Sequence, residues 1–209
     1  MWLQLAVLGS MILTLTFGTA FWQIGEAKNW RAYITELDVA AAPLILGLHD
    51  ADLPAQDRMM VEAIYPDVTL RSEVISWLRQ NRLSFFTEPR SHFMESRVPQ
   101  ESVKSERCEG FAETPVRLKN GWLRATGWAW DRLEHHPPRD LVFVGSSGVV
   151  IGVARSGLRR PDLTGKIAPA YLDESGWRGY ARDSGSGPIE VYGVLREPGQ
   201  FCRVGKISR

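Results

Sequence analysis

Six side chains in the second half of the chain are of the types that could bind a carbohydrate. Aromatic rings offer flat apolar surfaces that stack against a ring-shaped ligand, and a neighbouring guanidinium or carboxylate can hydrogen-bond to its polar groups. The stretch GWLRATGWAWD, residues 121–131, places three tryptophans within nine positions. The expected ligand-binding residues are Trp122, Arg124, Trp128, Trp130, Asp131 and Trp177.

The tryptophans also have a structural interpretation. In an unbroken strand Trp122, Trp128 and Trp130 share one face, and small residues such as Gly127 occupy the other. A binding face rarely backs onto such small residues, so we expect a bulge at Gly127 that splits the strand. Either Trp122 or the other two rings would then point inward, and one buried ring removes roughly 150–250 Å² from water. Core filling by Trp128 or Trp130 is therefore favoured over a binding platform.

An enzyme is the alternative function, namely a hydrolase or transferase that acts on carbohydrate. Its acid and base candidates are Asp131, His135 and Asp162. Glycoside hydrolysis needs two carboxylates roughly 5–10 Å apart in one cleft, and no motif sets such a pair, so no catalytic residue is assigned. His135 and His136 are adjacent and point to opposite sides of an extended chain, and no third ligand stands at a characteristic spacing. We expect no metal and no cofactor.

Four residues are expected to be structural. Cys108 and Cys202 bracket the last hundred residues, and a bridge between them would stabilise the fold by about 4 to 5 kcal/mol. Disulfides persist in oxidising compartments, so a bridge indicates a domain outside the cytoplasm. Two separate buried thiols are the alternative. Arg160 and Asp162 flank Pro161 and could form a bidentate ion pair that locks a corner.

The elements that position these residues fall into four segments. Residues 1–25 are expected to form a transmembrane helix, because positions 2–22 carry no charge and reach the roughly 30 Å of a bilayer core. Residues 26–86 are expected to be helical, residues 87–107 to be a linker, and residues 108–209 to be a β-sandwich. A cleaved signal peptide is the alternative for the first segment, but no basic residue precedes it.

The helical region contains three periodic stretches. Apolar residues recur every three or four positions over 26–48, where Pro43 is expected to kink or divide the helix. A second helix is expected to begin after Asp52 as its N-cap and to end near residue 64. A third should cover residues 70–80, with Asp67 or Thr69 as its cap.

Turn signals organise the last hundred residues. Asn120-Gly121 is a strong hairpin signal, residues 145–148 contain two glycines between apolar runs, and Pro198-Gly199 suits the centre of a type II turn. About seven short strands follow from this spacing. The expected fold class is therefore α+β: an N-terminal transmembrane helix and short helices, followed by an antiparallel, immunoglobulin-like β-sandwich.

Charge limits the partners. The chain has 25 basic and 24 acidic residues, a formal net charge of +1, and no basic field that would attract nucleic acid. The expected partners are a lipid bilayer and either a glycan or a polytopic membrane protein. The expected location is the cell membrane, with a single span and an extracytoplasmic C-terminal domain. Lys28 and Arg31 follow the predicted span and favour the opposite orientation, because basic residues usually stay inside.

The order of several motifs resembles the C-terminal region of bacterial polytopic, glycosyltransferase-like membrane proteins of polysaccharide assembly. The residues that carry the resemblance are IYPD at 64–67, WLRQNRLSFF at 77–86, GWAWD at 127–131, GVVIGVA at 148–154, RRPD at 159–162 and GWRGY at 176–180. The resemblance spans nearly the whole chain and carries no catalytic residue. It implies a non-catalytic, membrane-anchored module that binds a glycan or a protein partner in envelope polysaccharide assembly, and a purely structural brace of a larger membrane complex is a further alternative.

Overall fold

The strands of the second half of the chain build one continuous sheet. The computed structural model describes residues 23, 26–163, 173–183, 185 and 187–208, and its nine strands follow the order β1-β9-β8-β5-β6-β7-β4-β2, with β3 also paired to β4. All neighbours are antiparallel except β1 and β9, which are parallel. The strands are β1 Val103–Lys104, β2 Cys108–Ala112, β3 Val116–Arg117, β4 Trp122–Asp131, β5 Asp140–Val144, β6 Val150–Leu158, β7 Gly176–Arg182, β8 Ile189–Val194 and β9 Phe201–Ile207.

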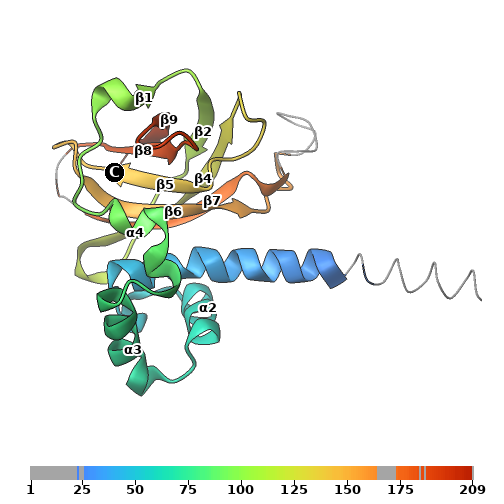
Figure 1. Cartoon of the computed structure of the whole chain (residues 1–209), viewed down its shortest axis with the longest axis vertical. Helices are drawn as coiled ribbons and strands as arrows, with labels where there is room; N and C mark the ends of the chain where they lie inside the picture. Colours follow the sequence, from blue (N-terminus) through green and yellow to red (C-terminus); the bar gives the residue numbers. More distant parts are fainter. Residues whose placement is uncertain (1–22, 24–25, 164–172, 184, 186, 209) are drawn as a thin grey trace, which may run out of the picture. The chain divides into compact units, whose positions relative to one another are not determined.

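The two ends of this sheet meet, so that it is nearly closed (Figure 1). Strand β2 lies at one end of the strand order and β9 near the other, yet a disulfide joins Cys108 of β2 to Cys202 of β9 with a Cα–Cα distance of 5.5 Å. Gly110 of β2 also lies against β9, because a Cβ there would stand 2.5 Å from Cγ1 of Val204. The predicted disulfide is confirmed.

The expected α+β class is compatible with the structure, but the expected immunoglobulin-like sandwich is wrong. The strands form a single curved sheet and not the two packed sheets of an immunoglobulin-like sandwich. Turn signals determine which strands are consecutive, but a curved sheet and a sandwich can use the same hairpins. In addition, no helix among the described residues combines the length and the apolar character that crossing a membrane requires. The segment predicted to do so, residues 2–22, lies outside the described residues.

The chain divides into two units, Met1–Thr35 and Glu36–Arg209. In the first unit residues 26–35 are helical and largely exposed, and Trp30 stacks edge-to-face on Tyr33 with ring centroids 5.9 Å apart. The second unit contains the whole sheet together with the remaining helices. Residues 36–46 are helical, and the other helices are η1 Asp50–Asp52, α2 Ala55–Ile64, α3 Val68–Gln80, η2 Ser84–Thr87, α4 Pro89–His92, η3 Gln100–Ser102 and η4 Lys119–Gly121.

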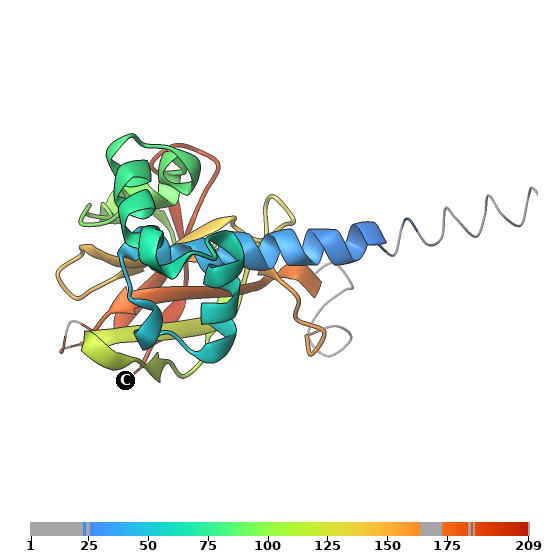
Figure 2. The ribbon, with the colours of Figure 1, turned by 90° about the horizontal axis from the view of Figure 1, so that it is seen from below.

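Helices of the second unit cover part of the outer face of the sheet, as two perpendicular views show (Figures 1 and 2). Their apolar side chains form one core with Trp122, Val153 and Tyr180 of the sheet. The segment interpreted as a linker, residues 87–107, contains α4 and β1, and Arg90 within it is fully buried. This segment packs against the sheet and the helices.

The local predictions had mixed outcomes. The Asp67 cap is confirmed, because its Oδ1 accepts hydrogen bonds from the backbone N–H groups of Thr69 at 2.9 Å and Leu70 at 3.2 Å. The Asp52 cap is wrong, because Pro54 occupies the N-cap position of α2. The chain remains helical on both sides of Pro43.

The three turn predictions are confirmed. Asn120 and Gly121 both adopt positive φ, 55° and 73°, before β4 begins. Strands β5 and β6 are paired across residues 145–148. In the turn between β8 and β9, Gly199 has a φ of 71° and the N–H of Gln200 donates to the carbonyl of Glu197 at 3.1 Å.

Candidate functional site

The predicted tryptophans do not form an exposed platform. Trp122, Trp130 and Trp177 have exposed fractions of 9%, 5% and 1%, and only Trp128 is half-buried. Strand β4 is unbroken, because Gly127 pairs with Ala112 on one side and Trp177 on the other, so the bulge expected at Gly127 is absent. Across the β2–β4 pair, Trp128 lies opposite Phe111, which is exposed.

The small residues of β4 make room for Trp177 inside the curved sheet. A Cβ at Gly127 would stand 2.5 Å from Cζ2 of Trp177 and 2.0 Å from the carbonyl oxygen of Phe111. Leu123, Ala125 and Ala129 share this inner core with Trp177 and the disulfide. The alternation of large and small residues therefore reflects a sheet with one helix-covered face and one tightly curved interior.

Arg124 anchors the sheet to α2. Its Nε donates to Oδ2 of buried Asp57 at 2.5 Å, and Nη1 of Arg178 lies 3.2 Å from Oδ1 of the same carboxylate. The Tyr180 hydroxyl donates to Asp57 as well. Burial, together with the charge of Asp57, raises the pKa of Tyr180 far above its usual range. Both oxygens of the Asp57 carboxylate therefore take part in structural hydrogen bonds or ion pairs.

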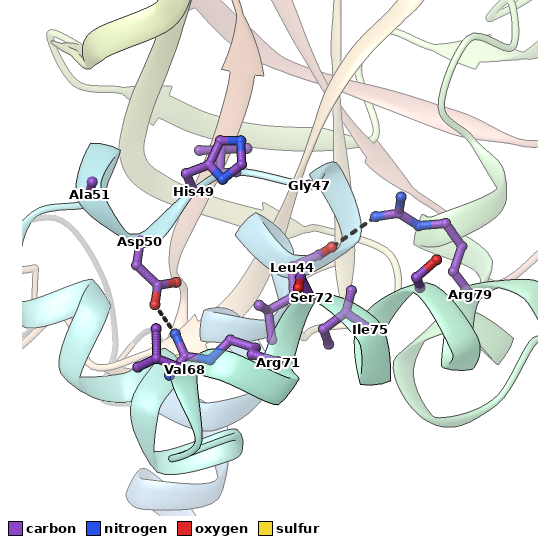
Figure 3. A pocket seen from close by; sticks show the side chains of 12 residues that line it. Leu44, Gly47, His49, Asp50, Ala51, Val68, Arg71, Ser72, Ile75 and Arg79 are labelled. Carbon is purple, nitrogen blue, oxygen red and sulfur yellow. Dashed lines mark hydrogen bonds and ion pairs between the residues drawn. The ribbon is translucent and has the colours of Figure 1, made fainter.

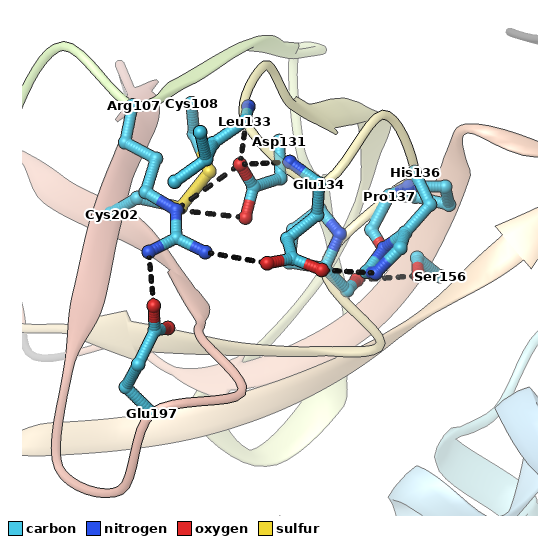
Figure 4. Close-up of a disulfide and its surroundings, with 11 residues drawn as sticks. Arg107, Cys108, Asp131, Leu133, Glu134, His136, Pro137, Ser156, Glu197 and Cys202 are labelled. Atoms are coloured by element: carbon cyan, nitrogen blue, oxygen red, sulfur yellow. Dashed lines mark hydrogen bonds and ion pairs between the residues drawn. A yellow bond between two sulfur atoms is a disulfide. The ribbon is translucent and has the colours of Figure 1, made fainter.

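Asp131 belongs to an ion-pair cluster beside the disulfide (Figure 4). Nε of Arg107 lies 3.0 Å from its Oδ2, and Nη1 of Arg107 lies 2.7 Å from Oε1 of Glu197. Hydrogen bonding to Glu197 raises the pKa of Arg107, and the same bond lowers the pKa of Glu197. Asp131 Oδ1 also accepts the backbone N–H of Leu133 at 2.9 Å and so closes the turn after β4.

The remaining candidates are dispersed. Arg160 donates from Nε and Nη2 to the two oxygens of Asp162 at 2.9 and 2.8 Å, the bidentate geometry expected for this corner. His135 is exposed with a φ of 55°, and His136 Nδ1 lies 2.8 Å from the carbonyl of Pro137. Within the described ranges, no three His, Cys, Asp or Glu side chains are grouped so that they could hold a metal ion.

A second buried network joins the helices to β5 and β6. Nη2 of Arg90 donates to Oδ1 of Asp38 at 2.8 Å, and Nε of Arg155 donates to Oδ2 of the same carboxylate at 2.6 Å. Nη1 of Arg155 also donates to Asp140 at 2.5 Å. Burial and the nearby charge of Arg155 lower the pKa of Arg90. Each arginine of this network is paired with a carboxylate, so we assign the network a structural role.

One predicted residue, Trp122, lines a cavity. This Trp122 cavity has a volume of about 410 Å³, within the usual range for small-ligand sites. It lies in the second unit where the helices meet the ends of β4 and β7. Its lining residues are Ile45, Leu46, Arg79, Phe86, Ser91, Met94, Glu95, Trp122, Val149, Val150, Ile151 and Arg182.

Two guanidinium groups in the Trp122 cavity are held against aromatic rings. Cζ of Arg182 lies 5.3 Å from the ring centroid of Trp122, and Cζ of Arg79 lies 5.2 Å from that of Phe86. Within the described part of the chain, neither arginine forms an ion pair with an acidic side chain. Arg79 Nη2 instead donates to the carbonyls of Leu44 at 3.2 Å and Ile45 at 3.3 Å. The cavity therefore offers oriented positive charge beside apolar surface.

Sequence reasoning missed Arg79 and Arg182. Arg79 lies on the third predicted helix, and Arg182 is the last residue of β7, 103 positions later in the numbering (182 − 79). No local spacing relates them, because only the tertiary packing of the helices and the sheet into one core brings them to one cavity. The one available signal was Trp122, whose ring contacts Arg182.

We compared the chain with known families, proteins and structures. No protein family model, curated protein or solved structure matches this chain.

Proposed function

We propose that this protein is a non-catalytic binding module of the cell envelope, and that the Trp122 cavity binds an acidic glycan, one that bears carboxylate or phosphate groups. The observation that carries the proposal is that Arg79 and Arg182, which form no ion pair with an acidic side chain among the described residues, each lie against an aromatic ring of one cavity. Guanidinium groups bind carboxylate and phosphate oxygens in a planar, directional way.

The lining suits a sugar derivative better than a bare anion. Trp122, Phe86 and Met94 supply apolar surface, while Ser91 and Glu95 supply a hydroxyl and a carboxylate that can hydrogen-bond to sugar hydroxyl groups. The residues of this proposed glycan site differ from the six ligand-binding residues that the sequence predicted. Trp122 belongs to both sets.

The proposed location is outside the cytoplasm. The disulfide between Cys108 and Cys202 supports it, because such bridges persist in oxidising compartments. A role in polysaccharide assembly rests on the resemblance of the sequence motifs. Labelling of thiols in intact cells tests the location: a protein without reactive thiols fits the proposal, whereas two free thiols contradict it.

The binding test uses purified protein and oligogalacturonates, with neutral malto-oligosaccharides of equal length as control ligands. Isothermal titration calorimetry should show binding of the acidic series only. Arg182→Gln should lower the affinity about tenfold, because one charge-assisted contact is lost. Arg196→Gln is the matched control, since Arg196 is exposed and pairs with Glu134 elsewhere.

Three results would contradict the glycan proposal. Equal binding of the neutral series would show that the guanidiniums do not select the ligand. Loss of binding in Trp128→Ala, with Arg182→Gln unchanged, would move the site to the half-exposed ring opposite Phe111. Absence of binding to either series would favour the structural brace, which the burial of Trp122, Trp130 and Trp177 also supports.

A further inference from the structure

A second cavity, here called the helical groove, lies among the helices of the second unit (Figure 3). It has a volume of about 470 Å³ and is bounded by the end of the helical segment 36–46, the η1 turn and α3. Nothing in the proposed glycan function uses this groove. Arg79 lines both cavities, and the other lining residues of the groove do not line the Trp122 cavity.

One face of α3 forms a wall of the groove. The lining residues from this helix recur at intervals of three and four, the spacing of a single helical face. They are Val68, Arg71, Ser72, Ile75, Ser76 and Arg79. From Arg71 to Arg79 this wall runs for about 12 Å along the helix axis, at about 1.5 Å per residue.

The middle of the groove is aliphatic. Leu44 and Leu48 contribute from the opposite side, and Val68 and Ile75 contribute from α3. Val68 is 60% exposed. An aliphatic ligand would remove this surface from water, at roughly 25 cal/mol per Å² of apolar area.

The two cations of the groove differ in their partners, as Figure 3 shows. Arg71 is buried and neutralised, because it pairs with Asp50 and its Nε donates to the carbonyl of Tyr65 at 2.9 Å. Arg79 has no acidic partner among the described residues, and it donates only from Nη2 to main-chain carbonyls. The guanidinium of Arg79 therefore leaves donors available at one end of an aliphatic groove.

The size and the chemistry of the groove select one class of occupant. A volume of about 470 Å³ matches a small ligand, whereas docking of a protein needs roughly 800 Å² on each partner. The aliphatic middle does not satisfy the hydroxyl groups of a sugar. The positive charge of Arg79, which has no acidic partner among the described residues, favours an anionic group and disfavours a cationic one.

We propose that the helical groove binds a single-chain anionic amphiphile, such as a fatty acid. The aliphatic chain lies over Leu44, Val68 and Ile75, and the anionic head group accepts hydrogen bonds from Arg79.

Calorimetry with dodecanoate, kept well below the concentration at which it forms micelles, tests the proposal on the full chain. We expect one molecule bound per chain, and no comparable binding of dodecyltrimethylammonium, which has the same tail and a cationic head. Ser72→Trp should abolish binding because an indole ring fills the groove. Glu73→Trp is the matched control, since Glu73 is exposed on the same helix and does not line the groove.

Further variants separate this site from the glycan site. Ser72→Trp should leave oligogalacturonate binding unchanged, and Arg182→Gln should leave dodecanoate binding unchanged. Arg79→Gln should weaken dodecanoate about tenfold. Ser72→Trp and Glu73→Trp should have the same midpoint of thermal unfolding. A lower midpoint of Ser72→Trp would show that this variant has a folding defect. Equal binding of the two detergents, or dodecanoate binding that survives Ser72→Trp, would overturn the proposal.

Discussion

The carboxylate of Asp57 on α2 and the guanidinium of Arg124 on β4 meet at 2.5 Å although they lie 67 positions apart. Arg178 and Tyr180 of β7 complete the group around Asp57. This contact fixes α2 to the outer face of the sheet.

Replacement of Asp57 by Asn should destabilise the fold strongly. Arg124 and Arg178 would remain partly buried without their shared counter-charge, and breaking one partner of a buried ion pair costs about 3 to 5 kcal/mol. Urea unfolding followed by tryptophan fluorescence measures the change in free energy. Asp52→Asn is the control and should cost less than about 1 kcal/mol, because the side chain of Asp52 accepts its hydrogen bond from the exposed side chain of Asn120. Equal effects of the two variants would show that the Asp57 group is not an anchor.

Substitution of Gly127 by Ala should also destabilise the fold. The new Cβ would stand 2.0 Å from the carbonyl oxygen of Phe111 and 2.5 Å from the Trp177 ring, and overpacking of this kind costs about 3 kcal/mol. Gly205→Ala on β9 is the matched control, because its Cβ would lie 3.7 Å from the nearest atom. Chemical unfolding of both variants checks the prediction, which fails if Gly127→Ala is as stable as Gly205→Ala.

Reduction of the disulfide should lower the free energy of unfolding by about 4 to 5 kcal/mol. Cys108 and Cys202 are 94 positions apart, and the chain-entropy model gives this magnitude for a loop of that length. Denaturation with and without reductant measures the loss. The double variant Cys108→Ser/Cys202→Ser should match the reduced protein and should not respond to reductant. A wild-type protein that is equally stable in both conditions would contradict the prediction.

The stability of the fold should decrease at alkaline pH through Tyr180. Burial raises the pKa of Tyr180 in the folded state, whereas an unfolded tyrosine ionises near pH 10. Below about pH 10 both states keep the proton, and above it only the unfolded state loses the proton, so stability falls as pH rises. Ultraviolet titration should show that Tyr180 ionises only on unfolding. Tyr180→Phe should remove this behaviour, and a normal titration of all five tyrosines would contradict it.

Local interactions were accessible from the sequence. The Asp67 cap and the turns at Asn120-Gly121 and Pro198-Gly199 depend on residues within three or four positions, so the residue types predicted them correctly. The disulfide was also predicted, because the chain contains only two cysteines and they could pair in only one way.

The tertiary structure alone decided whether the strands form a sandwich or one nearly closed sheet, and where the tryptophans point. The same hairpins are compatible with both arrangements, and Gly127 leaves room for the Trp177 ring inside the curved sheet. The tertiary structure also decided which charged groups lie together. Arg155 bonds to Asp38 across 117 positions, and Arg79 meets Arg182 in one cavity. Such distant partners are selected by the packing of whole elements, and no pattern of neighbouring residues encodes that packing.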